Sequence, residues 1–152
     1  MIFYLNKYIT KDLIKVNVEC ENWMEVVREG SNLLEKKNIV MPCYKENILK
    51  CFEEFGPYMV VAPKIAILHA RPEDGALKTS MSIIVLKNPV EFGNAQNDPL
   101  KVAFSFSSRN NCEHMELLSN LMKILMNQDD FNKLINSTDV EEVFEIVNKY
   151  NL

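Results

Sequence analysis

The chain has 152 residues, of which 47% are hydrophobic and 25% are charged, an ordinary composition for one globular domain. Its formal net charge is −4 and no block of lysine or arginine stands out, which argues against a nucleic-acid partner. No segment reaches the roughly 18 uninterrupted apolar residues of a membrane span, and the first residues lack the pattern of a secretion signal, so we expect a cytoplasmic protein without direct membrane insertion.

The first third of the chain predicts one strand followed by two helices. Residues 13 to 18 (LIKVNV) alternate as a strand does. Asn22 is suited to cap a helix whose apolar positions recur at helical spacing, namely Trp23, Val26, Val27, Leu33 and Leu34. A second helix is predicted to begin near Pro42 and to end at Gly56, with an inward face made of Tyr44, Ile48, Cys51, Phe52 and Phe55.

The middle of the chain changes to the pattern of strands. Four short apolar runs favour strands, at residues 58–62, 64–68, 81–86 and 101–106, and Pro63 separates the first two. Residues 88–99 (NPVEFGNAQNDP) have the composition of a loop.

The last third predicts helices again. One helix, with Ser108 or Asn111 as its cap, carries the apolar stripe His114, Leu117, Leu118, Leu121 and Leu125. Another, capped near Ser137 or Thr138, carries Val140, Val143, Phe144 and Val147. Helices on both sides of a block of strands imply an α/β domain with helices covering the sheet, in a strand order that the pattern does not give. Without an internal repeat or a flexible linker, we expect one domain over residues 1–152.

The turn HARPEDG at residues 69–75 gathers polar side chains directly after a predicted strand, where α/β proteins commonly place their chemistry. The neutral imidazole of His69 is nucleophilic near neutral pH and can hold a transferred group covalently. Arg71 can balance the charge of an incoming phosphoryl group. A lone histidine at a strand end can also serve only to hydrogen-bond a carbonyl, and the residues alone leave both interpretations open.

The second histidine, His114, lies in the first turn of a predicted helix, whose free N–H groups and dipole attract anions. The two histidines could therefore flank one phosphate, and a hydrogen-bonded core histidine is the structural alternative. Cys112 and His114 form a C-x-H pair to which His69 could add a third metal ligand, but no established ligand spacing supports a metal site. The four cysteines are expected to be reduced, and no glycine-rich nucleotide motif is present.

Residues 56–75 (GPYMVVAPKIAILHARPEDG) resemble the active-site segment of the enzyme IIA component of bacterial phosphoenolpyruvate-dependent sugar phosphotransferase systems. The likeness lies in the fructose and mannitol superfamily, nearest to its ascorbate-type branch, whose AP-x-x-A-x-x-HARPEDG signature is matched by Ala62, Pro63, Ala66 and residues 69–75. Residues 22–40, 41–58 and 105–125 also resemble the family. The resemblance implies a three-layer α/β/α domain with a mixed sheet, the mannitol-type enzyme IIA fold.

What the resemblance implies about function is a phosphocarrier. By analogy, His69 accepts a phosphoryl group from phospho-HPr on its Nε2 nitrogen and passes it to a cysteine of a IIB component during sugar uptake. His114 would contact the phosphate or steady His69, and Arg71 would stabilise the phosphate. No cofactor or metal is implied, the sugar is not identified, and the oligomeric state stays open, a homo-oligomer included.

Two departures from the family pattern keep alternatives open. Leu68 stands where the family usually has a proline before the active histidine, so the fixed backbone angle of proline is missing. Mannitol-type relatives place an arginine on the preceding helix, where this chain has Glu53 and Glu54. The alternative function is a regulatory interaction module of the same fold that senses the state of the phosphotransferase system without efficient relay, and a metal-dependent hydrolase is the third hypothesis.

Overall fold

A computed structural model of the chain describes residues 8–150. Its elements in chain order are η1 (Lys11–Leu13), β1 (Ile14–Val18), α2 (Trp23–Lys36), α3 (Cys43–Phe55), β2 (Val60–Ala62), β3 (Ile65–Leu68), η2 (Pro72–Asp74), β4 (Ser80–Val90), β5 (Leu100–Ser107), α4 (Asn111–Met126), α5 (Gln128–Ile135) and α6 (Val140–Asn148). Among these residues no helix is both long and apolar enough to cross a membrane.

The strands form one mixed sheet in the order β1-β4-β5-β3-β2. Strands β1 and β4 pair in parallel, as do β3 and β5, whereas β4 with β5 and β2 with β3 are antiparallel. The β3–β5 register runs from Ile65 opposite Val102 to Leu68 opposite Ser105. Because these two strands are parallel, the segments that follow them leave the sheet at the same edge.

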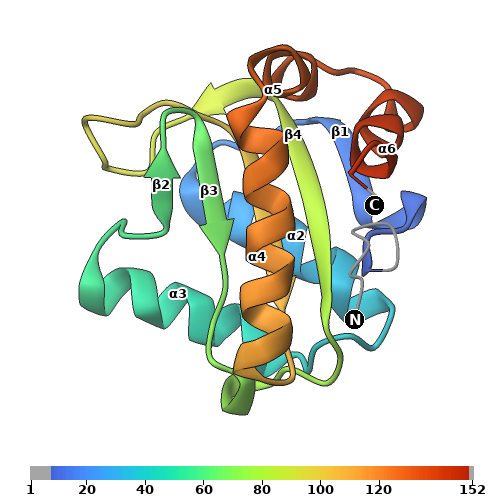
Figure 1. Cartoon of the computed structure of the whole chain (residues 1–152). Helices are drawn as coiled ribbons and strands as arrows, with labels where there is room; N and C mark the ends of the chain where they lie inside the picture. The colour runs from blue at the N-terminus through green and yellow to red at the C-terminus, as the bar shows by residue number, and fades with distance from the viewer. Residues whose placement is uncertain (1–7, 151–152) are drawn as a thin grey trace.

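Helices cover both faces of the sheet and give it two hydrophobic cores. Helices α2 and α3 pack on one face, where the core includes Val27, Leu34 and Ile48. Helices α4, α5 and α6 cover the other face, with Leu121 and Val143 in its core. Figure 1 shows α4 crossing the near side of the sheet with α2 behind it. The predicted three-layer α/β/α arrangement around a mixed sheet is confirmed.

Helix α2 approaches the centre of the sheet closely because it carries a glycine at the contact. The Ser82 hydroxyl donates a hydrogen bond of 2.8 Å to the Gly30 carbonyl oxygen. A Cβ atom at Gly30 would lie only 2.2 Å from Ser105 Oγ on β5. Residue 30 therefore has no room for a side chain at this contact.

Two predicted helix ends in the first third of the chain agree with the structure, whereas two predicted caps in the last third do not. The Asn22 side chain accepts a hydrogen bond of 3.0 Å from the Glu25 amide, as predicted for the start of α2. Gly56, at a φ of 78°, ends α3. The predicted caps of the two later helices are wrong, because α4 is capped by Asn110 and α6 by Asp139.

Three further predictions are wrong in the second half of the chain and at the end of α3. Helix α5 is missing from the sequence-based prediction, although Asn127 caps it through a bond from the Asp130 amide. The predicted loop over residues 88–99 begins too early, since β4 continues to Val90. Phe55, assigned to the inward face of α3, is 66% exposed.

Candidate functional site

The site lies where β3 and β5 end. All four residues of β3 are buried, and the strand stops where the chain meets His69 and the charged turn after it. That turn contains η2, whose proline stands at its first position and whose Asp74 side chain accepts from the Arg71 amide. A buried strand followed by a short, capped turn fixes the backbone of His69 from both directions.

The two histidines meet above a phenylalanine ring. The ring centroids of His69 and His114 are 5.7 Å apart, in an edge-to-face arrangement of 71°. Phe106, at the end of β5, stacks on the His69 ring at 5.0 Å and lies 4.8 Å from the His114 ring. Both histidines are partly exposed. The prediction that the two imidazoles lie close enough to flank one anion therefore fits the geometry.

One hydrogen bond sets the tautomer of His69. Its Nδ1 atom lies 3.1 Å from the Ile67 carbonyl oxygen. A carbonyl oxygen only accepts, so Nδ1 carries the proton of the neutral ring and Nε2 carries a free electron pair. Nε2 is the nitrogen with which a neutral His69 can attack an electrophile.

Burial keeps both rings neutral near physiological pH. It lowers the pKa of His69 below its ordinary value of 6.5; the hydrogen bond to Ile67 opposes this shift and the neighbouring His114 adds to it. Burial also lowers the pKa of His114. An uncharged His69 is the form that acts as a nucleophile.

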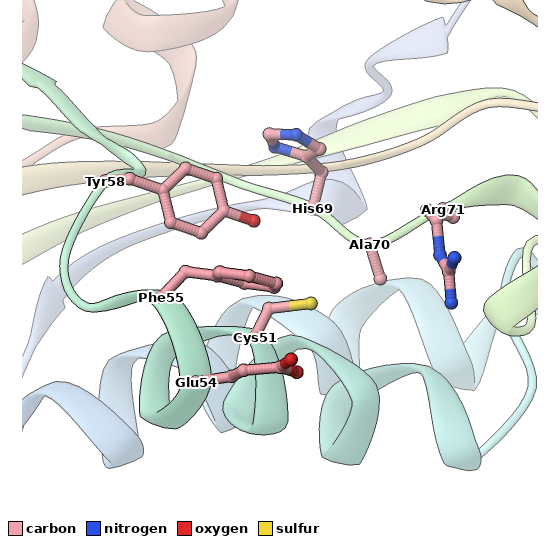
Figure 2. A pocket seen from close by; sticks show the side chains of 7 residues that line it. All are labelled: Cys51, Glu54, Phe55, Tyr58, His69, Ala70 and Arg71. Atoms are coloured by element: carbon pink, nitrogen blue, oxygen red, sulfur yellow. The ribbon is translucent and has the colours of Figure 1, made fainter.

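A pocket of about 410 Å³ opens beside His69. Its lining consists of Cys51, Glu54, Phe55, Tyr58, His69, Ala70 and Arg71. Figure 2 shows the Phe55 and Tyr58 rings on one side of the pocket and Arg71 on the other. Phe55 and Tyr58 are 66% and 49% exposed, so large apolar side chains border the approach to the imidazole.

The Arg71 guanidinium lies in the wall of this pocket but is bound to acidic neighbours. Its Nε atom is 3.2 Å from Asp74 Oδ2 and 3.6 Å from Glu73 Oε1, and its side chain is 74% exposed. In Figure 2 the side chain extends toward α3 and away from the His69 ring. The structure thus brings Arg71 to the same pocket as His69 without directing its charge at the imidazole.

The Tyr44 hydroxyl, at the start of α3, is buried under the site. It lies 2.7 Å from the Phe106 carbonyl oxygen, 3.0 Å from the Ala70 amide nitrogen and 3.3 Å from the Ala70 carbonyl oxygen. The sequence marks Tyr44 only as an inward-facing residue of a helix. A buried tyrosine hydroxyl nevertheless requires partners, and this is the signal that could have drawn attention to it.

Comparison with known proteins decides the family. The family model described as "Phosphoenolpyruvate-dependent sugar phosphotransferase system, EIIA 2" matches residues 7–150. The chain belongs to this enzyme IIA family. It is 33% identical over 139 residues to the ascorbate-specific enzyme IIA component of Escherichia coli K12, covering 91% of this chain and 90% of that protein. The corresponding Salmonella typhimurium component is 32% identical with the same coverage.

Solved structures of enzyme IIA proteins have the same fold. The mannitol-specific cryptic enzyme IIA of Escherichia coli is 28% identical, with a TM-score of 0.88 over 97% of this chain and 99% of that one. Mannitol enzyme IIA of the same organism is 25% identical, with a TM-score of 0.80 over 91% and 98%. The chain therefore has the mannitol-type enzyme IIA fold, and as a member of the enzyme IIA family it is a phosphotransferase that acts as a phosphocarrier in sugar uptake.

The geometry gives no support to the metal-site hypothesis for this enzyme IIA. Residues 8–150 contain no group of three or more His, Cys, Asp or Glu side chains placed to hold a metal ion. Cys112 is exposed, and its Sγ atom lies 3.7 Å from Glu116 Oε1.

The amino end of α4 is partly occupied, because Asn110 accepts hydrogen bonds from the backbone amides of Glu113 and His114. The backbone amides of Glu113 and His114 are therefore not free to bind an anion, and His114 contacts the His69 ring with its imidazole.

Proposed function

We propose that His69 accepts the phosphoryl group on Nε2 and that phospho-HPr is the donor. The observation that carries this proposal is the hydrogen bond from Nδ1 to the Ile67 carbonyl, which leaves Nε2 as the nucleophilic nitrogen beside an open pocket. The Nε2 electron pair forms the new bond to phosphorus while the donor's nitrogen–phosphorus bond breaks, and the electrons of that bond stay with the donor nitrogen. The Nδ1 proton does not move.

Transfer onward reverses the same step. A cysteine thiolate of a IIB component attacks phosphorus, and Nε2 recovers its electron pair. Between the two steps the His69 ring carries a positive charge, which the Ile67 carbonyl oxygen stabilises through the Nδ1 proton. Phosphoryl transfer depends mainly on in-line positioning and on stabilising charge, so this small set of groups suffices on the carrier.

His114 and Arg71 are proposed to stabilise the phosphoryl oxygens. The His114 ring is near enough to donate a hydrogen bond to a group on Nε2, and a phosphoryl charge beside it favours its protonated form. Exposed ion pairs contribute little stability, so the Arg71 guanidinium can exchange Asp74 for a phosphoryl oxygen. The side chains of His114 and Arg71 would therefore interact more strongly with phosphorylated His69 than with unphosphorylated His69.

Partner docking is proposed to take place over the exposed rings of Phe55 and Tyr58. Exposed aromatic side chains are typical of interface cores, and both rings line the pocket beside His69. A related solved structure is a complex of mannitol enzyme IIA with phosphorylated mannitol enzyme IIB from Escherichia coli, with a TM-score of 0.81. We place the relay in the cytoplasm, where phosphoenolpyruvate is made.

Labelling from phosphoenolpyruvate tests the assignment of His69. The protein is incubated with labelled phosphoenolpyruvate, enzyme I and HPr, and acid-labile phosphate on the chain is measured. The wild type and His114→Gln should take up label, the variant more slowly, whereas His69→Gln should take up none. Label retained in His69→Gln, or no label on the wild type with competent partners, contradicts the proposal.

The ascorbate-specific relatives suggest which acceptor to use. We infer that an ascorbate-type IIB component accepts the phosphoryl group faster than a mannitol-type IIB. Rapid-quench measurements with both acceptors, starting from the labelled protein, compare the two rates. Equal rates, or a faster mannitol-type transfer, contradict the inference. Stable label that reaches no acceptor supports the regulatory alternative.

A further inference from the structure

We propose that the Tyr44 hydroxyl is the positioning group of the relay, which fixes His69 relative to Phe106 and His114 by bridging the ends of β3 and β5. The inference rests on the proposed function of His69, and it adds a residue that never touches the phosphoryl group. Its basis is the place of this hydroxyl in the hydrogen-bond pattern of the sheet.

The hydroxyl takes over where the ladder between β3 and β5 stops. The last pair in register is Leu68 with Ser105. Beyond it, the Ala70 amide donates to the Tyr44 oxygen at 3.0 Å, and the Tyr44 hydroxyl donates to the Phe106 carbonyl at 2.7 Å. One side-chain group thus stands between a donor on one strand extension and an acceptor on the other, as a substitute for a direct backbone bond.

The two bridged residues control the geometry of the imidazoles. Ala70 follows His69 directly, so holding its amide limits rotation of the backbone that carries the histidine. Phe106 supplies the ring that stacks on His69 at 5.0 Å and contacts His114 at 4.8 Å. Movement of either strand end would change the distance between His69 and His114 and the direction in which Nε2 points.

Packing alone does not explain a hydroxyl at this position. Tyr44 has no exposed surface, and a phenylalanine would occupy nearly the same volume without burying an oxygen. Burial of a hydroxyl is unfavourable unless its hydrogen bonds are made, and here both its donor and its acceptor capacity are used. Burial raises the pKa of Tyr44 to about 12, so the hydroxyl keeps the proton that it donates to Phe106.

The test compares Tyr44→Phe with Tyr150→Phe as a matched control. Tyr150 also donates its hydroxyl to a buried partner, Asp130 Oδ2 at 2.5 Å, and it follows α6, which packs on β1 at the far edge of the sheet from β2 and β3. Both variants lose one hydrogen-bonded hydroxyl, so both should lose thermal stability. Only Tyr44→Phe should alter the site.

Two readouts separate positioning from stability. The maximal rate of transfer from phospho-HPr to His69 should fall at least about tenfold in Tyr44→Phe with little change in KM, since misplacement by about 1 Å lowers rates by up to roughly a hundredfold. In the unphosphorylated wild type, nitrogen NMR should show Nε2 of His69 unprotonated. In Tyr44→Phe, a displaced ring would lose its hydrogen bond to the Ile67 carbonyl, so a mixture of tautomers is expected. Tyr150→Phe should match the wild type in both.

A Tyr44→Phe rate within about twofold of the control, with wild-type ring signals, overturns the proposal. If the wild type takes up no label, the proposed function of His69 fails, and the ring signals alone decide the role of Tyr44. If Tyr44→Phe does not fold, lactic acid in place of Ala70 replaces the N–H that donates to Tyr44 by an ester oxygen, and the same loss of rate and tautomer is expected.

Discussion

Replacement of Gly30 by alanine should destabilise the protein, against the usual preference of helices for alanine. The new Cβ atom would lie 2.2 Å from Ser105 Oγ and 3.1 Å from Ser105 Cβ. Overpacking of a core by one methyl group costs about 1–3 kcal/mol, and the shorter contact places this case at the upper end. Alanine is favoured over glycine in a helix by about 1 kcal/mol, so we expect a net loss of about 2 kcal/mol.

Urea unfolding followed by circular dichroism measures this loss, and a second substitution tests its cause. Ser105→Ala removes the oxygen of the shorter contact, and that oxygen has no hydrogen-bond partner among residues 8–150. In the Ser105→Ala background, Gly30→Ala should therefore cost less than about 1 kcal/mol, a coupling of at least about 1 kcal/mol. A Gly30→Ala variant as stable as the wild type, or additive effects of the two substitutions, would contradict a clash between residue 30 and Ser105.

Three further measurements test the site and its surroundings. Because burial lowers the pKa of His69, the rate of its phosphorylation should fall with decreasing pH along a titration whose midpoint lies below 6.5; a proton NMR titration with a midpoint above 6.5 would contradict this. Arg71→Ala should slow phosphoryl uptake several-fold and Asp74→Asn should not, because the latter releases the guanidinium; equal slowing in single-turnover assays argues against a role for Arg71. The pKa of Asp130 is lowered by hydrogen bonds from its lysine and tyrosine partners, so its stabilising effect is present above pH 3.8 and is lost as the pH falls through the lowered pKa; acid unfolding of Asp130→Asn should lack this component.

The sequence predicts the parts of this molecule that depend on local patterns. The cap at Asn22 and the end of α3 at Gly56 follow from side chains that act on their own backbone neighbourhood. The pairing of His69 with His114 follows from the family motif and from two histidines placed after strands. Both imidazoles lie beside Phe106 for a reason that the sequence does not show, namely that β3 and β5 are adjacent and parallel.

The features that the sequence does not predict have different causes. Strand β4 continues through Pro89 to Val90 because its pairing with β1 has already ended at Leu86, so the missing N–H breaks no bond to that neighbour. Only Asn127 lies between the end of α4 and the start of α5, so the sequence pattern offers almost no break from which a separate eight-residue helix could be predicted. The partners of the Tyr44 hydroxyl lie 26 and 62 positions along the chain.

The two helical layers each contribute one half of the histidine environment. Helix α3 reaches in from one face of the sheet with a phenol group, and α4 from the opposite face with the second imidazole. A shift of either layer would change the position of one of the two histidines relative to the other. The outward-facing residues of α3 and α4 do not hold the histidines. Substitutions there can therefore change which transporter the protein contacts without changing the chemistry at the sheet edge.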